Sequence, residues 1–161
     1  MRILVGITYY RPHISGLTIY AERLAKALVR RGHQVTVLTS RYDPNLAAEE
    51  IDEGVRIVRA PVALRISKGV IMPTIGWLAS RLVAENDVVH LHLPQFDAAG
   101  IALRGRLMGK PTVLTYHCDL LMPPGLMSSL ANQAVHLMNH LAARFTNKIV
   151  TYTRDYAENS P

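Results

Sequence analysis

The sequence lacks several features that would place it in a common class of protein. Cys118 is the single cysteine among 161 residues, so no disulfide forms within the chain and we expect a reducing cytoplasm. The longest apolar stretch, residues 70–79, is too short to cross a bilayer and contains Pro73. The first residues do not form a signal peptide, because tyrosines and a proline soon follow a short apolar run. We therefore expect a cytoplasmic protein, with peripheral association at the cytoplasmic membrane face left open.

Several sequence motifs of nucleotide and hydrolytic chemistry are also missing. The first apolar run is not followed by G-x-G-x-x-G, since Gly6 lies inside it and Gly16 opens the next segment, which disfavours a dinucleotide dehydrogenase. Neither the P-loop pattern nor the G-x-S-x-G pattern of serine hydrolases occurs, and paired carboxylates for glycoside hydrolysis are not evident. Arg41, after the second apolar run, keeps an NADP-type oxidoreductase as the weaker alternative.

The charge is unbalanced toward the basic side. Eighteen lysines and arginines against twelve acidic residues give a formal net charge of +6, which favours phosphates or anionic lipid as partners. The basic residues are scattered, and Arg30 and Arg31 form the single adjacent pair. We therefore do not expect nucleic acid to be a partner.

Segments of strand and helix character alternate along the chain. β-branched and apolar runs predict strands at residues 3–7, 34–39, 55–58, 87–93, 111–116 and 148–152. Helical periodicity predicts helices at residues 17–31, 70–85, 97–108 and 127–145, with an acidic loop at 40–54. Ser15 is expected to cap the first helix and Gly32 to end it. The alternation predicts an α/β, Rossmann-like three-layer sandwich with a mainly parallel sheet.

The predicted fold indicates where a ligand would bind. In a doubly wound sheet with strand order 3-2-1-4-5-6, the crevice lies beyond the carboxyl ends of the first and fourth strands. The loop at 9–16, His92 at the end of the fourth strand and the 117–119 segment after the fifth strand meet at this edge. The loop at 9–16 leads into a helix N-terminus, whose free N–H groups and dipole favour an anion.

The histidines of the chain do not form an obvious metal site. His90 and His92 are two residues apart on a strand and share a face, but no third ligand is evident. We expect His90 to be a hydrogen-bonded interior residue and His92 to touch the crevice. His136 and His140 have the spacing of a zinc pair on a helix, yet their polar neighbours favour a solvated helix face. No metal or other cofactor is predicted.

His117 directly follows a predicted strand. A histidine in this position binds or donates to a substrate oxygen near neutral pH, or is satisfied by a backbone carbonyl, and residue chemistry alone leaves both open. We interpret the neighbouring Cys118 as a small buried thiol rather than a nucleophile, since no base is indicated.

Four blocks of the sequence resemble one enzyme family. Residues 12–39 read PHISGLTIYAERLAKALVRRGHQVTVLT and resemble the opening P-x-x-G-G, L-A-x-x-L and G-H-x-V-x-V-x-T patterns of family 4-like, retaining GT-B glycosyltransferases. DVVHLH at 87–92, VLTYHCDL at 113–120 and IVTYTRDYAE at 149–158 are similar to the second, third and fourth blocks of that family. The blocks follow in order and cover the whole chain.

The resemblance implies a division of labour between two Rossmann-like domains. Residues 1–161 match the N-terminal, acceptor-side domain, and a C-terminal donor-binding domain would lie outside this chain. Gly16 aligns with the second glycine of G-G, whose backbone approaches the donor phosphates, and Ser15 stands in place of the first. His117 aligns with the histidine that contacts the donor sugar and supports catalysis. The implied activity is hexosyl transfer from a nucleotide sugar to an acceptor hydroxyl with retention, and we expect the chain alone to be inactive.

The acceptor is expected to be a sugar or a lipid-linked molecule, at a site that could adjoin an anionic membrane surface. Arg65 and Arg81 flank the apolar stretch that begins at residue 70, which is the basis of the membrane hypothesis. The rival interpretation is a non-catalytic Rossmann module that binds a sugar or nucleotide. The residues expected to contact the acceptor are Tyr9, Tyr10, Arg11, His13, Arg65, His92 and Asp119.

Overall fold

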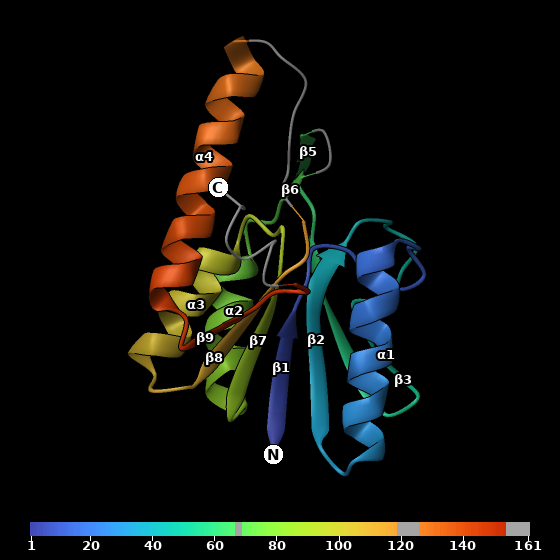
Figure 1. Cartoon of the computed structure of the whole chain (residues 1–161). Helices are drawn as coiled ribbons and strands as arrows, with labels where there is room; N and C mark the ends of the chain where they lie inside the picture. Colours follow the sequence, from blue (N-terminus) through green and yellow to red (C-terminus); the bar gives the residue numbers. More distant parts are fainter. Residues whose placement is uncertain (67–68, 119–125, 154–161) are drawn as a thin grey trace.

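β-branched and leucine-rich segments form a central sheet in the computed structural model, which describes residues 1–66, 69–118 and 126–153. In this part of the chain the sheet has seven strands in the order β3-β4-β2-β1-β7-β8-β9 (Figure 1). The strands are β1 (Arg2–Gly6), β2 (Gln34–Arg41), β3 (Glu49–Asp52), β4 (Val55–Pro61), β7 (Val88–Leu93), β8 (Thr112–Tyr116) and β9 (Lys148–Val150).

The sheet is parallel except at one edge. β1 pairs in parallel with β2 on one side and with β7 on the other, where Gly6 lies opposite Leu91. If the antiparallel edge strand β3 is set aside, the order agrees with the predicted 3-2-1-4-5-6, so that prediction is confirmed. The reversal of strand order therefore falls between β1 and β7, where ligands bind in such folds.

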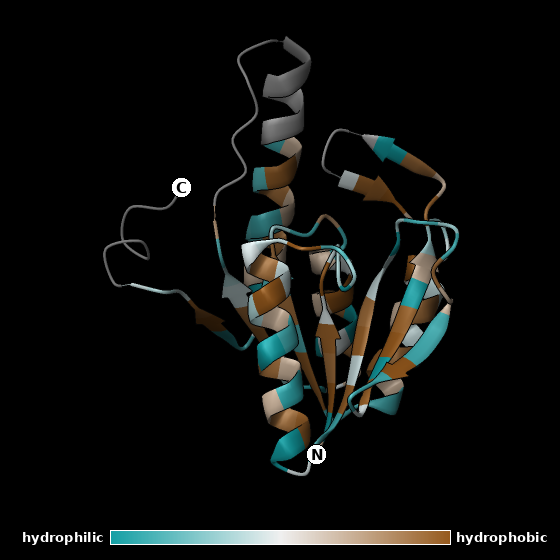
Figure 2. Cartoon of the chain, turned by 90° about the vertical axis from the view of Figure 1, so that its right-hand side faces the viewer, coloured by the Kyte–Doolittle hydropathy of each residue, from teal (hydrophilic) through white to brown (hydrophobic). Residues whose placement is uncertain are grey.

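Helices cover both faces of the sheet, so the predicted three-layer sandwich is confirmed. The helices are α1 (Gly16–Arg30), α2 (Ile75–Glu85), α3 (Ala98–Leu107) and α4 (Leu126–Phe145). α1 packs Ala21 and Ala25 against one face of the sheet, whereas α2, α3 and α4 contribute to the apolar cluster on the other face (Figure 1). Hydrophobic residues follow the central strands in Figure 2, because parallel strands are buried on both sides.

The ends of α1 form as the sequence predicts. Ser15 is the N-cap, and its side-chain oxygen accepts a hydrogen bond from the backbone N–H of Thr18 at 3.2 Å. Gly32 follows the helix with a φ of +81°, in the left-handed region that a glycine enters without steric cost. The Ser15 cap fixes the direction in which the loop at 9–16 enters the helix, and the Gly32 turn directs the chain from the helix into β2.

The acidic segment predicted as a loop contains a strand instead. β3 pairs antiparallel with the outer edge of β4, with Glu49 opposite Val58 and Asp52 opposite Val55. Ion pairs hold it there, since Glu49 contacts Arg56 at 3.0 Å. The loop prediction is wrong for residues 49–52 because the carboxylates are matched by arginines that lie later in the sequence.

The segment predicted as the first turn of the second helix forms a hairpin. β5 (Leu64–Ile66) and β6 (Gly69–Ile71) pair antiparallel and lie outside the main sheet. The helix begins only at Ile75, two residues after Pro73. The ring of proline disfavours a helical residue before it, so the β-branched residues that precede Pro73 pair as strands.

Candidate functional site at the carboxyl ends of β1, β7 and β8

Three neighbouring strands bring the predicted site segments to one edge of the sheet. β1 lies beside β7 and β7 beside β8, and Leu93 at the end of β7 is opposite Tyr116 at the end of β8. The backbone N–H of His117 then donates to the carbonyl oxygen of Leu93 at 3.2 Å. This hydrogen bond fixes the start of the loop after β8 beside the end of β7, so His92 and His117 are brought together.

A short chain of hydrogen bonds passes through His117. Its Nε2 lies 2.9 Å from Nδ1 of His92, and its Nδ1 lies 2.5 Å from the hydroxyl oxygen of Tyr152. His92 is fully buried with an exposed fraction of 0%, whereas Tyr152 is 55% exposed. His92 therefore reaches the crevice only through His117, and the expected contact of its side chain with an acceptor is not supported by its position.

Tyr20 packs against all members of this chain. The centroid of its ring lies 5.0 Å from that of His117, 5.8 Å from that of Tyr152 and 5.9 Å from that of His92, in edge-on arrangements. Sequence reasoning treated Tyr20 only as part of the apolar face of α1 and did not assign a role to Tyr152. The position of Tyr20, one turn into a helix that starts at the crevice, was the available signal.

His90 lies next to His92 on β7 and adds a third histidine to this cluster. Its Nε2 forms a 2.7 Å hydrogen bond with the hydroxyl of Thr115 on β8, and its ring lies 4.4 Å from the ring of His92. The prediction that His90 is hydrogen-bonded and shares a face with His92 is confirmed, although its side chain is half-buried rather than fully interior.

Burial keeps these histidines uncharged. Desolvation lowers the pKa of His90 to about 4 and that of His92 to about 2, and the nearby imidazoles add to both shifts. Burial also lowers the pKa of His117. At neutral pH the site therefore presents neutral imidazoles, which accept and donate hydrogen bonds rather than contribute a positive charge.

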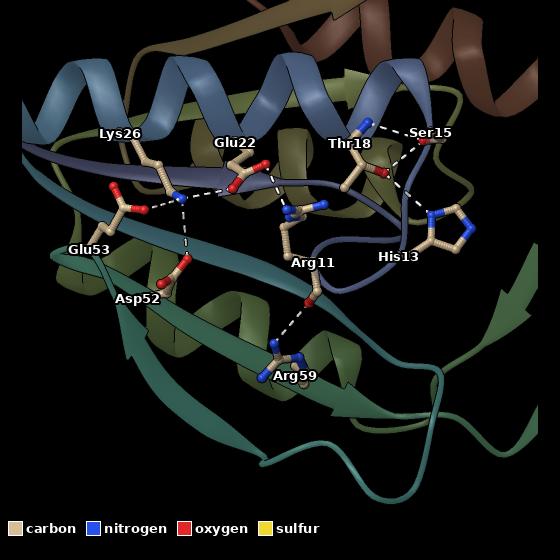
Figure 3. A network of polar contacts seen from close by, with 9 residues as sticks. All are labelled: Arg11, His13, Ser15, Thr18, Glu22, Lys26, Asp52, Glu53 and Arg59. Carbon is tan, nitrogen blue, oxygen red and sulfur yellow. Dashed lines mark hydrogen bonds and ion pairs between the residues drawn. The ribbon is translucent and has the colours of Figure 1, made fainter.

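The loop at 9–16 is tied to the rest of the fold by charged side chains. Figure 3 shows Arg59 reaching from β4 to the carbonyl oxygen of Arg11, at 3.0 Å, while the Arg11 guanidinium contacts Glu22 on α1 at 3.1 Å. Lys26, one turn further along α1, bridges Glu22 and Glu53 at 2.7 Å each. The ion pair with Glu22 thus directs the guanidinium of Arg11 toward α1.

Tyr10 lies apart from the other residues of this loop. Its side chain is 1% exposed and packs in the apolar cluster under α1, and burial raises its pKa to about 12. A ligand in the crevice does not meet this side chain, so its expected acceptor contact is incompatible with its position. Its size and aromatic character are explained by packing instead.

Rings from two loops gather at the exposed end of the 9–16 segment. Tyr9 stacks on His13 with a centroid distance of 4.9 Å, and Tyr42 meets both rings edge-on at 5.7 Å. Tyr42 follows β2 and was not among the predicted site residues. Sequence reasoning placed it in the loop after the second strand and did not use the predicted pairing of β1 and β2 to bring it beside residues 9–13.

Of the two residues predicted to contact the donor phosphates at the start of α1, Gly16 is accessible and Ser15 is engaged within the protein. Gly16 is exposed, and a Cβ atom built on it would meet no atom within 4 Å. The hydroxyl of Ser15 is already engaged, at 2.7 Å from that of Thr18 and as the cap of the helix. The backbone at Gly16 is accordingly accessible, while the Ser15 side chain serves the helix.

The remaining predicted residues lie farther out or outside the described part of the chain. Arg65 is exposed on β5, and Asp119 lies outside the described residues. Cys118 is exposed, so the prediction of a buried thiol is wrong; it follows the strand at the point where the chain leaves the sheet. Arg41, the basis of the NADP alternative, donates to the carbonyl oxygens of Leu46 and Pro44 at 2.7 and 2.8 Å. These hydrogen bonds already engage its guanidinium within its own loop.

Neither a metal cluster nor a membrane span is found in the parts of the chain that the structure covers. Within residues 1–66, 69–118 and 126–153, no group of three or more histidine, cysteine, aspartate or glutamate side chains is placed to hold a metal ion. In the same residues no helix has both the length and the hydropathy to cross a bilayer.

The mainly parallel sheet, with its reversal of strand order between β1 and β7, defines a Rossmann-like α/β domain. The family model of the glycosyl transferase 4-like domain matches residues 15–160. The chain belongs to this family of glycosyltransferases, which confirms the resemblance drawn from the sequence.

Individual relatives agree with this assignment. The chain is 28% identical over 167 aligned residues to an uncharacterized glycosyltransferase of Methanocaldococcus jannaschii, covering 98% of this chain and 41% of that protein. It is 29% identical over 128 residues to a GDP-mannose-dependent alpha-mannosyltransferase of Mycolicibacterium smegmatis, covering 74% and 33%. The chain thus spans less than half the length of these relatives.

A solved structure shares the fold. Sucrose-phosphate synthase of Thermosynechococcus elongatus superimposes with a TM-score of 0.50 over 93% of this chain and 47% of that one, at 13% sequence identity. At this identity the likeness is one of fold alone, and it agrees with the α/β sandwich described above.

Proposed function

We propose that this chain is the acceptor-side domain of a retaining glycosyltransferase that moves a hexosyl group from a nucleotide sugar to an acceptor hydroxyl. The observation that carries the proposal is the position of His117, which follows β8 beside the carboxyl end of β7, with one ring nitrogen toward an exposed side chain. Membership of the glycosyl transferase 4-like family supports the same activity.

The neutral state of His117 suits a role in sugar binding. Burial lowers its pKa, so at neutral pH its imidazole is uncharged and its ring nitrogens exchange hydrogen bonds with hydroxyl groups. A hydroxyl of the donor sugar would be bound in this way beside the bond that breaks. Such a contact orients the sugar through a hydrogen bond and adds no positive charge beside it.

The start of α1 would receive the donor phosphates. Gly16 leaves its backbone open to close approach, and the N-terminus of a helix of fifteen residues favours an anion. The half-buried rings of Tyr9, His13 and Tyr42 would lie toward the acceptor.

We propose that transfer needs a second, donor-binding domain, since the relatives are more than twice as long as the part that this chain matches. The test compares this chain with a polypeptide that joins it to a C-terminal donor-binding domain. Nucleotide release from a panel of nucleotide sugars is measured, with GDP-mannose included because one relative uses it. We expect nucleotide release from the joined protein and none from this chain by itself.

Variants separate the transferase from a binding module. His117→Ala should lower release by the joined protein at least about a hundredfold, as expected for the loss of a group that acts in the transition state. His140→Gln, on the exposed side of α4, is the matched control and should leave the rate unchanged. Donor binding without release by the joined protein would support the non-catalytic module and overturn the proposal.

The proposed acceptor is a sugar or a lipid-linked molecule at an anionic membrane surface. Leu64 is 54% exposed and Ile71 is 45% exposed on the hairpin that carries Arg65, which supports this idea. Arg81 contributes less than its charge suggests, because it contacts Glu49 at 3.3 Å and Glu85 at 3.7 Å. Co-sedimentation with vesicles that contain anionic lipid at low salt tests this, and absence of binding would contradict it.

A further inference from the structure

Both ring nitrogens of His117 are engaged, and the two partners differ in accessibility. Nε2 faces Nδ1 of His92, which is fully buried, and Nδ1 faces the hydroxyl of Tyr152, which is 55% exposed. A ligand in the crevice therefore reaches a ring nitrogen of His117 only at Nδ1, by taking the position of the Tyr152 hydroxyl. Which hydrogen-bonding group it meets there depends on where the proton of the neutral imidazole lies.

Two proton arrangements satisfy the bond between the histidines. In the first, Tyr152 donates to His117, His117 donates from Nε2 to His92, and His92 carries its proton on Nε2. In the second, His92 donates from Nδ1 to Nε2 of His117, and His117 carries its proton on Nδ1 and donates to the Tyr152 oxygen. Each neutral imidazole has one donor and one acceptor nitrogen, so the state of His92 fixes the state of His117.

The surroundings of His92 favour the second arrangement. Its Nε2 is buried and has no hydrogen-bond partner among the described residues. The first arrangement would place an N–H group there, and buried N–H groups without an acceptor are rare in proteins, whereas acceptors without a donor are tolerated more often. The Tyr152 hydroxyl loses nothing in the second arrangement, because at its exposed position it donates to water.

We propose that His92 is a positioning residue that holds His117 in the tautomer protonated at Nδ1, so that His117 presents a hydrogen-bond donor at the position of the Tyr152 hydroxyl. The group that replaces Tyr152 is then an oxygen that accepts a hydrogen bond, such as a sugar hydroxyl. Tyr152 occupies this position until the ligand arrives. The identity of the ligand rests on the proposed function, whereas the tautomer is a property of the chain alone.

The decisive measurement is the tautomeric state of His117 in the whole 161-residue chain, by nitrogen-15 NMR of the imidazole rings at neutral pH. Nitrogen shifts distinguish a protonated from an unprotonated ring nitrogen, and His117→Gln assigns the signals. We expect protonated Nδ1 and unprotonated Nε2 for both His117 and His92. A proton on Nε2 of His117 would overturn the proposal, whatever the chain is found to catalyse.

Three variants test whether His92 sets the tautomer of His117. His92→Asn keeps an amide donor near the position of Nδ1 and should preserve the tautomer of His117, whereas His92→Leu removes the donor and should produce a mixture of both tautomers. Tyr152→Phe should leave the tautomer unchanged, because His92 sets it from the buried side. A change of tautomer in Tyr152→Phe, or none in a folded His92→Leu, would contradict the assignment to His92.

Kinetics of the joined two-domain protein give a second readout. Nucleotide release from GDP-mannose should fall at least about tenfold in His92→Leu and recover to within about threefold of wild type in His92→Asn. Tyr152→Phe should keep or raise kcat/KM, since no hydroxyl needs to be displaced. If the joined protein releases no nucleotide from any donor, the proposed function fails, while the NMR result still decides the tautomer.

Discussion

The guanidinium of Arg59 donates a hydrogen bond to the backbone carbonyl oxygen of Arg11 at 3.0 Å, and so connects the buried strand β4 to the loop after β1. The Arg59 side chain is 1% exposed. It also donates to the carbonyl oxygen of Ala47 at 3.1 Å and pairs with Glu50 at 2.5 Å. One buried cation thereby fixes both the loop after β1 and the loop after β2.

Replacing this arginine should destabilise the fold. Arg59→Met keeps most of the volume but leaves two carbonyl oxygens without their donor, so we expect the free energy of unfolding to fall by about 2–3 kcal/mol. The loss stays below that of a fully buried pair because Glu50, at 43% exposed, regains water. Urea unfolding followed by circular dichroism measures the change.

Arg56 on the same strand provides the control. Its side chain is 38% exposed and pairs with Glu49 and Glu85 at 3.0 and 3.1 Å. Arg56→Met should cost about 0–1 kcal/mol, the range of surface ion pairs. Equal losses in the two variants would show that Arg59 contributes no more than a surface charge.

Gly16→Ala should separate donor binding from stability. The added methyl group meets no atom within 4 Å, and alanine is the better helix former, so the free energy of unfolding should stay constant or rise by up to about 1 kcal/mol. If the donor phosphates approach this backbone, the methyl group obstructs them, and Kd for GDP-mannose in the joined protein should rise about tenfold. Calorimetry of binding checks this, and unchanged affinity would remove Gly16 from the proposed phosphate site.

Ser15 should act mainly through the helix cap. Ser15→Ala removes the oxygen that accepts from the Thr18 N–H and should lower the free energy of unfolding by about 1 kcal/mol, whereas Ser15→Gly should cost only a few tenths. Donor affinity should change little in Ser15→Gly, because the family pattern has a glycine there. A large loss of affinity in Ser15→Gly at unchanged stability would assign the hydroxyl to the ligand instead.

The sequence predicted where the site lies better than it predicted which residues form it. Hydrophobic periodicity and the alternation of strands and helices predicted a mainly parallel sheet, and the common strand order of doubly wound sheets placed His92 and His117 at one edge. Tyr20 and Tyr152 were missed because they contact each other across 132 positions of sequence, and no local sequence pattern indicates such a contact. β3 was missed for a different reason, since its acidic residues lack the apolar alternation of a strand, although its partners Arg56 and Arg59 lie only seven and nine residues further on.

The buried histidines should make the fold sensitive to mild acid. His90 has a pKa of about 4 in the folded chain, against about 6.5 when unfolded. Below pH 6.5 the unfolded chain binds a proton that the folded chain does not, so stability is complete above pH 6.5 and falls as the pH approaches 4. The slope is about 1.4 kcal/mol per pH unit for each such histidine, and His92, with a pKa of about 2, adds to it in the same direction.

His90→Gln isolates this contribution. Glutamine places an amide near Nε2 and keeps a partner for the Thr115 hydroxyl, but it does not titrate. Between pH 7.5 and 4.5 the variant should lose about 2–3 kcal/mol less than the wild type, as measured by urea unfolding at each pH. Ile101→Val, in the buried core, should lower stability by about 1 kcal/mol at both pH values and leave the difference between them unchanged. If His90→Gln and the wild type show the same pH dependence, His90 is protonated as readily in the folded chain as in the unfolded one, and its neutral state is not what burial imposes.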